Sequence, residues 1–123
     1  DQNLKPKTVI EIYYPPFVTA GKNTFISDIL IKSGARLAFK IDENWPTPSI
    51  EEILTADPDL IVKTHAQTDS AIDKYFAKGK KKIFVPENAD VFLQPGVESV
   101  SAVYELYNFI RVNFPSASFA KVE

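Results

Sequence analysis

Apolar positions along the chain alternate between the spacing of strands and the spacing of helices. Strands are indicated where β-branched and aromatic residues cluster, and helices where apolar residues recur every three or four positions. The pattern predicts strands at residues 8–14, 35–39, 60–64 and 82–85. It predicts helices at residues 24–33, 49–56, 69–78 and 98–112. This alternation is typical of a three-layer α/β sandwich, in which a mainly parallel sheet carries helices on both faces.

The ends of the predicted helices carry their own signals. Ser49-Ile50-Glu51-Glu52 has the spacing of a capping box, in which Ser49 caps the helix and Glu52 reaches back to it. Gly34 is placed to stop the helix before it, and Pro115 ends the last one. We therefore expect short, well-bounded helices between the strands.

The loops after the strands lie at residues 14–23, 41–48, 65–68 and 86–96. Right-handed crossovers bring such loops to one edge of a parallel sheet. Open α/β sheets bind ligands at that edge, where the carboxyl ends of the strands lie. The first loop is also stiff, because it contains Pro15-Pro16. The sequence thus predicts a ligand-binding edge built partly from a rigid loop.

Several short motifs follow one another in a fixed order along the chain. They are Tyr14-Pro15-Pro16-Phe17, Gly34, Trp45-Pro46-x-Pro48-Ser49-x-Glu51 and Ile53-Leu54-x-x-x-Pro58-x-x-Ile61. In this order they resemble the C-terminal lobe of the periplasmic binding proteins that deliver cobalamin, haem and ferric siderophores to ABC importers, and the cobalamin-binding members are the most similar. The resemblance covers about residues 5–114. It implies a Rossmann-like fold and a single lobe over residues 1–123, without the N-terminal lobe and the linking helix.

The resemblance also implies which residues meet the ligand. Phe17 and Trp45 fall where the family places aromatic rings against it, and Asp90 falls in a loop that carries ligand-contacting polar groups. Tyr14 ends the first predicted strand, so its phenol either meets the ligand or a ferric ion, or packs. His65, the only histidine, either contacts the ligand, donates an axial nitrogen to haem, or is a loop histidine with no functional role. For Phe17 and Trp45 the alternative is ordinary packing, because aromatic side chains mostly serve cores.

Glu51 is expected to act at a different surface. The capping box occupies Ser49 and Glu52, which leaves Glu51 exposed in the first helical turn. In the family, the glutamate of this Ser-x-Glu motif docks into arginines of the membrane permease. The resemblance therefore implies that Glu51 is a permease-docking residue, and a solvated carboxylate near a helix start is the alternative.

Composition narrows the classes of function. The chain has 123 residues, enough for one domain with its own core. Its net charge of −2 does not favour binding to the negatively charged backbone of a nucleic acid. Cysteine is absent, which excludes thiolate catalysis and thiolate metal sites. No nucleophile elbow, phosphate-binding glycine loop or paired-histidine motif occurs, so we expect neither an enzyme nor a cofactor or resident metal site.

These observations predict a substrate-binding component of an ABC importer that captures an iron complex, as a ferric siderophore or haem, or cobalamin. No arginine follows Pro95-Gly96, where the family commonly has a basic residue, so the ligand stays open among these classes. We expect a monomer that is periplasmic or is an extracellular, membrane-anchored lipoprotein, with any signal or anchor upstream of Asp1. The alternatives are a chelatase-like enzyme lobe acting on a tetrapyrrole and, more weakly, a receiver-like signalling module.

Overall fold

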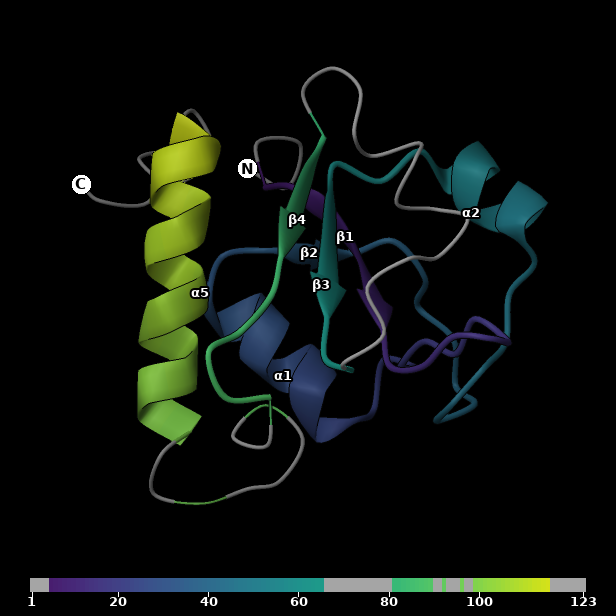
Figure 1. Cartoon of the computed structure of the whole chain (residues 1–123), viewed down its shortest axis with the longest axis horizontal. Helices are drawn as coiled ribbons and strands as arrows, with labels where there is room; N and C mark the ends of the chain where they lie inside the picture. The colour runs from purple at the N-terminus through teal and green to yellow at the C-terminus, as the bar shows by residue number, and fades with distance from the viewer. Residues whose placement is uncertain (1–4, 66–80, 90–91, 93–95, 97–98, 116–123) are drawn as a thin grey trace.

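Seven helices and strands make up the described part of the molecule. The computed structural model describes residues 5–65, 81–89, 92, 96 and 99–115 of the chain (Figure 1). In chain order the elements are β1 (Lys7–Glu11), α1 (Phe25–Lys32), β2 (Arg36–Leu37), α2 (Ile50–Ala56), β3 (Leu60–Lys63), β4 (Lys82–Phe84) and α5 (Ser99–Asn113). Each corresponds to a predicted segment, and the predicted helix at residues 69–78 lies outside the described residues.

The sheet has the strand order β2-β1-β3-β4, and every pair of neighbouring strands is parallel. Thr8 pairs with Leu60, and Glu11 pairs with Lys63, so β1 and β3 end side by side. β2 has one neighbour only and forms an edge of the described sheet. The α/β class with a parallel sheet, expected from the sequence, is confirmed.

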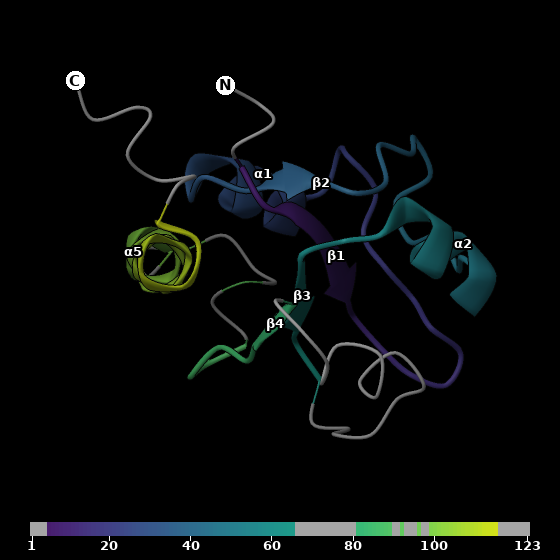
Figure 2. The same cartoon turned by 90° about the horizontal axis from the view of Figure 1, so that it is seen from above.

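Helices cover both faces of this sheet, as Figure 2 shows, with α1 and α5 on one side and α2 on the other. Side chains alternate along a strand, so Leu60 and Val62 enter one core while Ile61 enters the other. The larger core contains Leu60 and Val62 together with Ile29, Leu30, Leu106 and Ile110, among others. The smaller core holds Val9, Phe17, Ile53 and Ile61. Full burial of one such aliphatic side chain stabilises a fold by about 1.5 to 3 kcal/mol.

The helix ends agree with their sequence signals. The Ser49 backbone N–H donates to Glu52 Oε1 at 2.7 Å, and the Glu52 N–H donates to Ser49 Oγ at 3.1 Å, which confirms the capping box. Thr24 caps α1 by accepting from the Ser27 N–H at 3.3 Å. Gly34 follows α1 with a φ of 102°, a conformation that favours glycine. None of the helices within the described ranges is both long and apolar enough to cross a bilayer.

The first strand is shorter than its sequence pattern predicts. β1 stops at Glu11, because the chain turns back on itself: the Ile12 N–H donates to Val18 O at 2.7 Å and the Val18 N–H to Tyr13 O at 3.0 Å. Pro15 and Pro16 have no N–H with which to continue a ladder. The aromatic residues that suggested a longer strand therefore lie in a tight loop.

Candidate functional site

The candidate site lies at the carboxyl ends of the strands, an edge that we call the ligand edge. It comprises the loops at residues 12–23 and 38–48 together with His65, which follow β1, β2 and β3. In Figure 1, β1 and β3 run downward, and the chain leaves both strands at their lower ends. The ligand edge is therefore where the sequence predicted it.

Three main-chain hydrogen bonds join the first two loops. The Thr19 N–H donates to Pro46 O at 3.0 Å, and the Gly21 N–H donates to Asn44 O at 2.9 Å. The Lys22 N–H donates to Ile41 O at 2.9 Å. Because one loop follows β1 and the other follows β2, these bonds turn two separate connections into one fixed unit.

Gly21 makes this close approach possible. A Cβ atom added at Gly21 would lie 1.9 Å from the carbonyl oxygen of Glu43 and 2.6 Å from that of Ile41. Both are main-chain atoms and cannot rotate away. The Gly21 carbonyl is also held, because the hydroxyls of Thr24 and Ser27 donate to it at 3.0 and 2.6 Å. Position 21 therefore requires glycine, because the backbones of the two loops are in contact there.

Trp45 stands on the second loop, between the two carbonyls that accept from the first. Its side chain is 50% exposed, although its neighbours Asn44 and Pro46 are pinned by their main chains. Within the described part of the chain, its indole N–H has no hydrogen-bond partner. An exposed aromatic ring on a rigid loop can stack on a flat ligand at low entropic cost. The assignment of Trp45 as a ligand-binding residue stays a prediction.

Phe17 and Tyr14 both pack against the smaller core. Phe17 is only 4% exposed and packs in the smaller core with Ile53 and Ile61, so the lobe offers little of its ring to a ligand. Tyr14 is half-buried and packs against the same core. The burial of Phe17 favours the packing alternative, and its assignment as a ligand-binding residue stays a prediction.

A buried cluster of charged groups lies at the ends of β1 and β3. The Glu11 side chain is fully buried, and its Oε2 atom lies 2.5 Å from His65 Nε2 and 4.0 Å from Lys63 Nζ. The side chains of Lys63 and His65 are 4% and 10% exposed. The imidazole of His65 is within hydrogen-bond distance of the Glu11 carboxylate, whereas Lys63 is close enough for an ion pair only. Glu11 therefore fixes where the imidazole of His65 lies on the ligand edge.

The sequence analysis did not identify Tyr13 and Glu11 as residues of this edge. Tyr13 is 54% exposed, and its ring centroid lies 6.1 Å from that of His65 at an interplanar angle of 47°. It is Tyr13, rather than Phe17, that offers an exposed aromatic ring beside His65. Glu11 was not identified because a single acidic residue in an apolar strand is not part of a recognisable motif. The charged Lys63 at the end of the buried run Leu60-Ile61-Val62 was the available signal for a buried ion pair.

Glu51 lies in the first turn of α2. It is exposed, and within the described residues its carboxylate makes no hydrogen bond or ion pair. This matches the expected division of roles, since Glu52 serves the capping box. Docking to a permease stays a prediction. Asp90, the remaining predicted ligand-binding residue, lies outside the described residues.

The described residues of this edge do not form a metal site. Across the described ranges, no group of three or more His, Cys, Asp or Glu side chains is arranged to hold a metal ion. What the edge offers instead is exposed aromatic surface from Trp45 and Tyr13, beside an ordered imidazole. That combination suits a ligand with flat or apolar parts.

Comparisons with known proteins give one consistent result. No protein-family model matches the chain, and no curated protein sequence matches it significantly. Among solved structures, the periplasmic vitamin B12 binding protein BtuF of Vibrio cholerae superposes on 89% of the chain with a TM-score of 0.77 and 16% identity. The chain has the fold of a binding-protein lobe.

Two further solved structures share this lobe. A possible iron-binding periplasmic solute-binding protein from Staphylococcus epidermidis covers 86% of the chain, with a TM-score of 0.67 and 24% identity. An ABC transporter substrate-binding protein from Listeria monocytogenes covers 85%, with a TM-score of 0.67 and 16% identity. The resemblance noted in the sequence is confirmed at the level of the fold.

The chain spans less than half the length of these proteins. It covers 45%, 45% and 46% of the Vibrio, Staphylococcus and Listeria proteins, respectively. The similarity therefore concerns one lobe, and the activity of a whole protein is a separate matter.

Proposed function

We propose that this chain is the C-terminal lobe of a substrate-binding protein that captures a metal chelate and delivers it to an ABC permease. The observation that carries the proposal is the rigid loop pair that holds Trp45 half-exposed at the ligand edge of a binding-protein fold. The ligand is a ferric siderophore, haem or cobalamin. The protein is periplasmic, or extracellular and lipid-anchored, and acts as a monomer without catalysis of its own.

The chemistry of the edge supports this ligand class. Metal chelates of these kinds present flat rings or aromatic groups, which stack on exposed aromatic side chains. Trp45 and Tyr13 supply such surfaces, and their exposure reaches half in both cases. His65 is ordered beside them by the buried carboxylate of Glu11. Tyr14 and Asp90 remain proposed as secondary contacts, and Phe17 supports the loop from beneath.

Glu51 provides the proposed contact with the permease. Its carboxylate is exposed, lies in the first turn of α2 and is not needed for the capping box. An exposed carboxylate can pair with a basic group of a partner without any rearrangement of the lobe. The ligand and the permease would thus use different surfaces.

The test is a calorimetric titration of the protein with a ferric siderophore, haemin and cobalamin in turn. The proposal expects saturable binding of one class, and Trp45→Ala should weaken it by about tenfold, the effect of losing one anchoring ring. Tyr104→Ala is the matched control, because Tyr104 is an aromatic residue of α5 that is 63% exposed and lies away from the ligand edge. Absence of binding by all three classes, or equal losses in both variants, would refute the proposal.

A further inference from the structure

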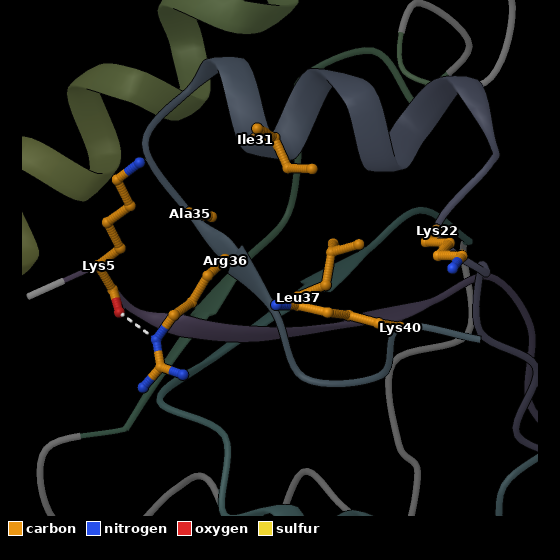
Figure 3. Close-up of a pocket in the computed structure, with 7 residues that line it drawn as sticks. All are labelled: Lys5, Lys22, Ile31, Ala35, Arg36, Leu37 and Lys40. Carbon is orange, nitrogen blue, oxygen red and sulfur yellow. Dashed lines mark hydrogen bonds between the residues drawn. The ribbon is translucent and has the colours of Figure 1, made fainter. Parts of the chain in front are cut away.

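A concave surface lies beside β2 at an edge of the described sheet, and the proposed function does not use it. This edge pocket has a volume of about 300 Å³ and is lined by Lys5, Lys22, Ile31, Ala35, Arg36, Leu37 and Lys40 (Figure 3). It lies between α1 and β2, the strand with one neighbour only in the described sheet. All four charged residues that line it are cations.

Three of these cations have no acidic partner among the residues that the structure describes. Arg36 donates through Nε to the Lys5 carbonyl oxygen at 3.1 Å, but within the described residues its terminal nitrogens, and the ammonium groups of Lys5 and Lys40, form no ion pair. Lys22 pairs with Asp42 at 3.1 Å, yet that carboxylate is 85% exposed. By contrast, Lys32, Lys63 and Lys81 each have a carboxylate within 4.0 Å.

This concentration of positive charge is notable in a chain that has 16 acidic and 14 basic residues. A concave surface lined by one sign of charge focuses the local field and attracts counter-ions. The lining also has an apolar part. Ile31 is 49% exposed, and Figure 3 shows Leu37 between Lys5 and Arg36 on one side and Lys22 on the other, with the Lys40 side chain extending toward Leu37.

We propose that the edge pocket binds a small organic dianion with an apolar body, such as a medium-chain dicarboxylate. Lys5 and Arg36 bind one charged end of the ligand, and Lys22 and Lys40 bind the other. Ile31 and Leu37 contact its apolar middle. A volume of about 300 Å³ lies at the small end of the range for ligand pockets. An added peptide strand is a poorer occupant, because β2 has two residues and would form few main-chain hydrogen bonds with it.

The competing explanation is that these cations only protect the sheet edge. Lysine and arginine on an edge strand discourage pairing with strands of other molecules. That role needs charge but no ligand, and it does not require an exposed apolar residue such as Ile31. The two explanations differ in what a dianion does to the protein.

The test is an NMR titration of the amide signals of the protein with suberate, octanoate and inorganic phosphate. We expect saturable shifts at Ile31, Leu37 and Lys40 with suberate, and weaker binding of octanoate and of phosphate. Lys40→Glu should lower suberate affinity by about tenfold, because one end loses a cation and gains a repelling charge. Ile31→Ser should lower suberate affinity and leave phosphate binding unchanged.

Lys32→Glu is the matched control, since it makes the same change of net charge on α1 outside the pocket. Equal losses in Lys40→Glu and Lys32→Glu would overturn the proposal in favour of a general field. Phosphate binding as tight as suberate binding would overturn the role of the apolar part. No saturable shift with suberate, together with aggregation of Lys40→Glu, would assign the cations to edge protection alone. None of these results depends on binding of a metal chelate.

Discussion

The carboxylate of Glu11 and the imidazole of His65 meet at 2.5 Å although 54 residues separate them in the sequence. Glu11 ends β1 and His65 follows β3, so the contact ties the ends of two neighbouring strands together. Lys63 approaches the same carboxylate oxygen from β3. The ligand edge thus rests on a buried ionic cluster as well as on main-chain hydrogen bonds.

Glu11→Ala should destabilise the protein strongly. The substitution removes a fully buried carboxylate that lies beside Lys63 and His65, and breaking a buried pair in this way costs about 3 to 5 kcal/mol of the free energy of unfolding. Urea unfolding measures the loss. Lys32→Gln, which breaks the exposed pair between Lys32 and Asp28, should cost about 0.5 kcal/mol or less. Similar losses in the two variants would contradict the importance of the buried cluster.

Much of the fold could be predicted from the sequence, because it depends on local patterns. The runs at Leu60 and Lys82 have the composition of buried strands, and the capping box and Gly34 bound their helices through local hydrogen bonds and backbone conformation. The motif order pointed to the lobe that the solved structures share. These signals act over a few residues, so they can be read without the fold.

The candidate site was only partly predictable, because its geometry depends on contacts between distant segments. Trp45 was found through its motif, but nothing local indicates that Phe17 turns into the core or that Tyr13 stays exposed. Glu11 and His65 become partners only when β1 and β3 pair. Likewise Gly21 looks like an ordinary loop glycine until the second loop lies against it.

Gly21→Ala should displace the loop that carries Trp45. The added methyl group would overlap the carbonyl oxygen of Glu43, so one loop must move, at a cost of about 1 to 3 kcal/mol in stability. We expect a shifted emission maximum of the single tryptophan and a lower midpoint of urea unfolding. Gly96→Ala is the control, because a Cβ atom there meets nothing within 4 Å. An unchanged emission maximum in Gly21→Ala would show that the loops are not rigidly joined.

Phe17→Ala and Trp45→Ala should separate packing from recognition. Phe17 is buried in the smaller core, so its truncation should cost about 3 to 5 kcal/mol of stability. Trp45 is half-exposed, and its truncation should cost about 1 kcal/mol or less while weakening ligand binding. Thermal unfolding and calorimetric titration of both variants provide the comparison. The reverse order of stability losses would contradict the assigned positions of the two rings.

Glu51→Ala should reduce transport without affecting ligand affinity, provided that the lobe acts within a complete binding protein and its importer. A charge pair at the proposed docking surface is lost, while the ligand edge is untouched. Glu52→Ala is the matched variant: it removes half of the capping box and should cost about 1 kcal/mol or less in stability. Uptake and melting temperature are measured for both. Normal uptake by Glu51→Ala, or the same behaviour of both variants, would exclude the docking role.

The most direct measurement uses the fluorescence of Trp45, which is the only tryptophan of the chain. Haem, cobalamin and many ferric siderophores absorb light and quench a nearby indole, so the protein is titrated with each ligand while tryptophan emission is followed. We expect saturable quenching by one ligand class, and Gly21→Ala should require a higher ligand concentration for half-maximal quenching. Emission that falls only in proportion to ligand absorbance for all three classes, without saturation, would contradict a metal-chelate site at the ligand edge.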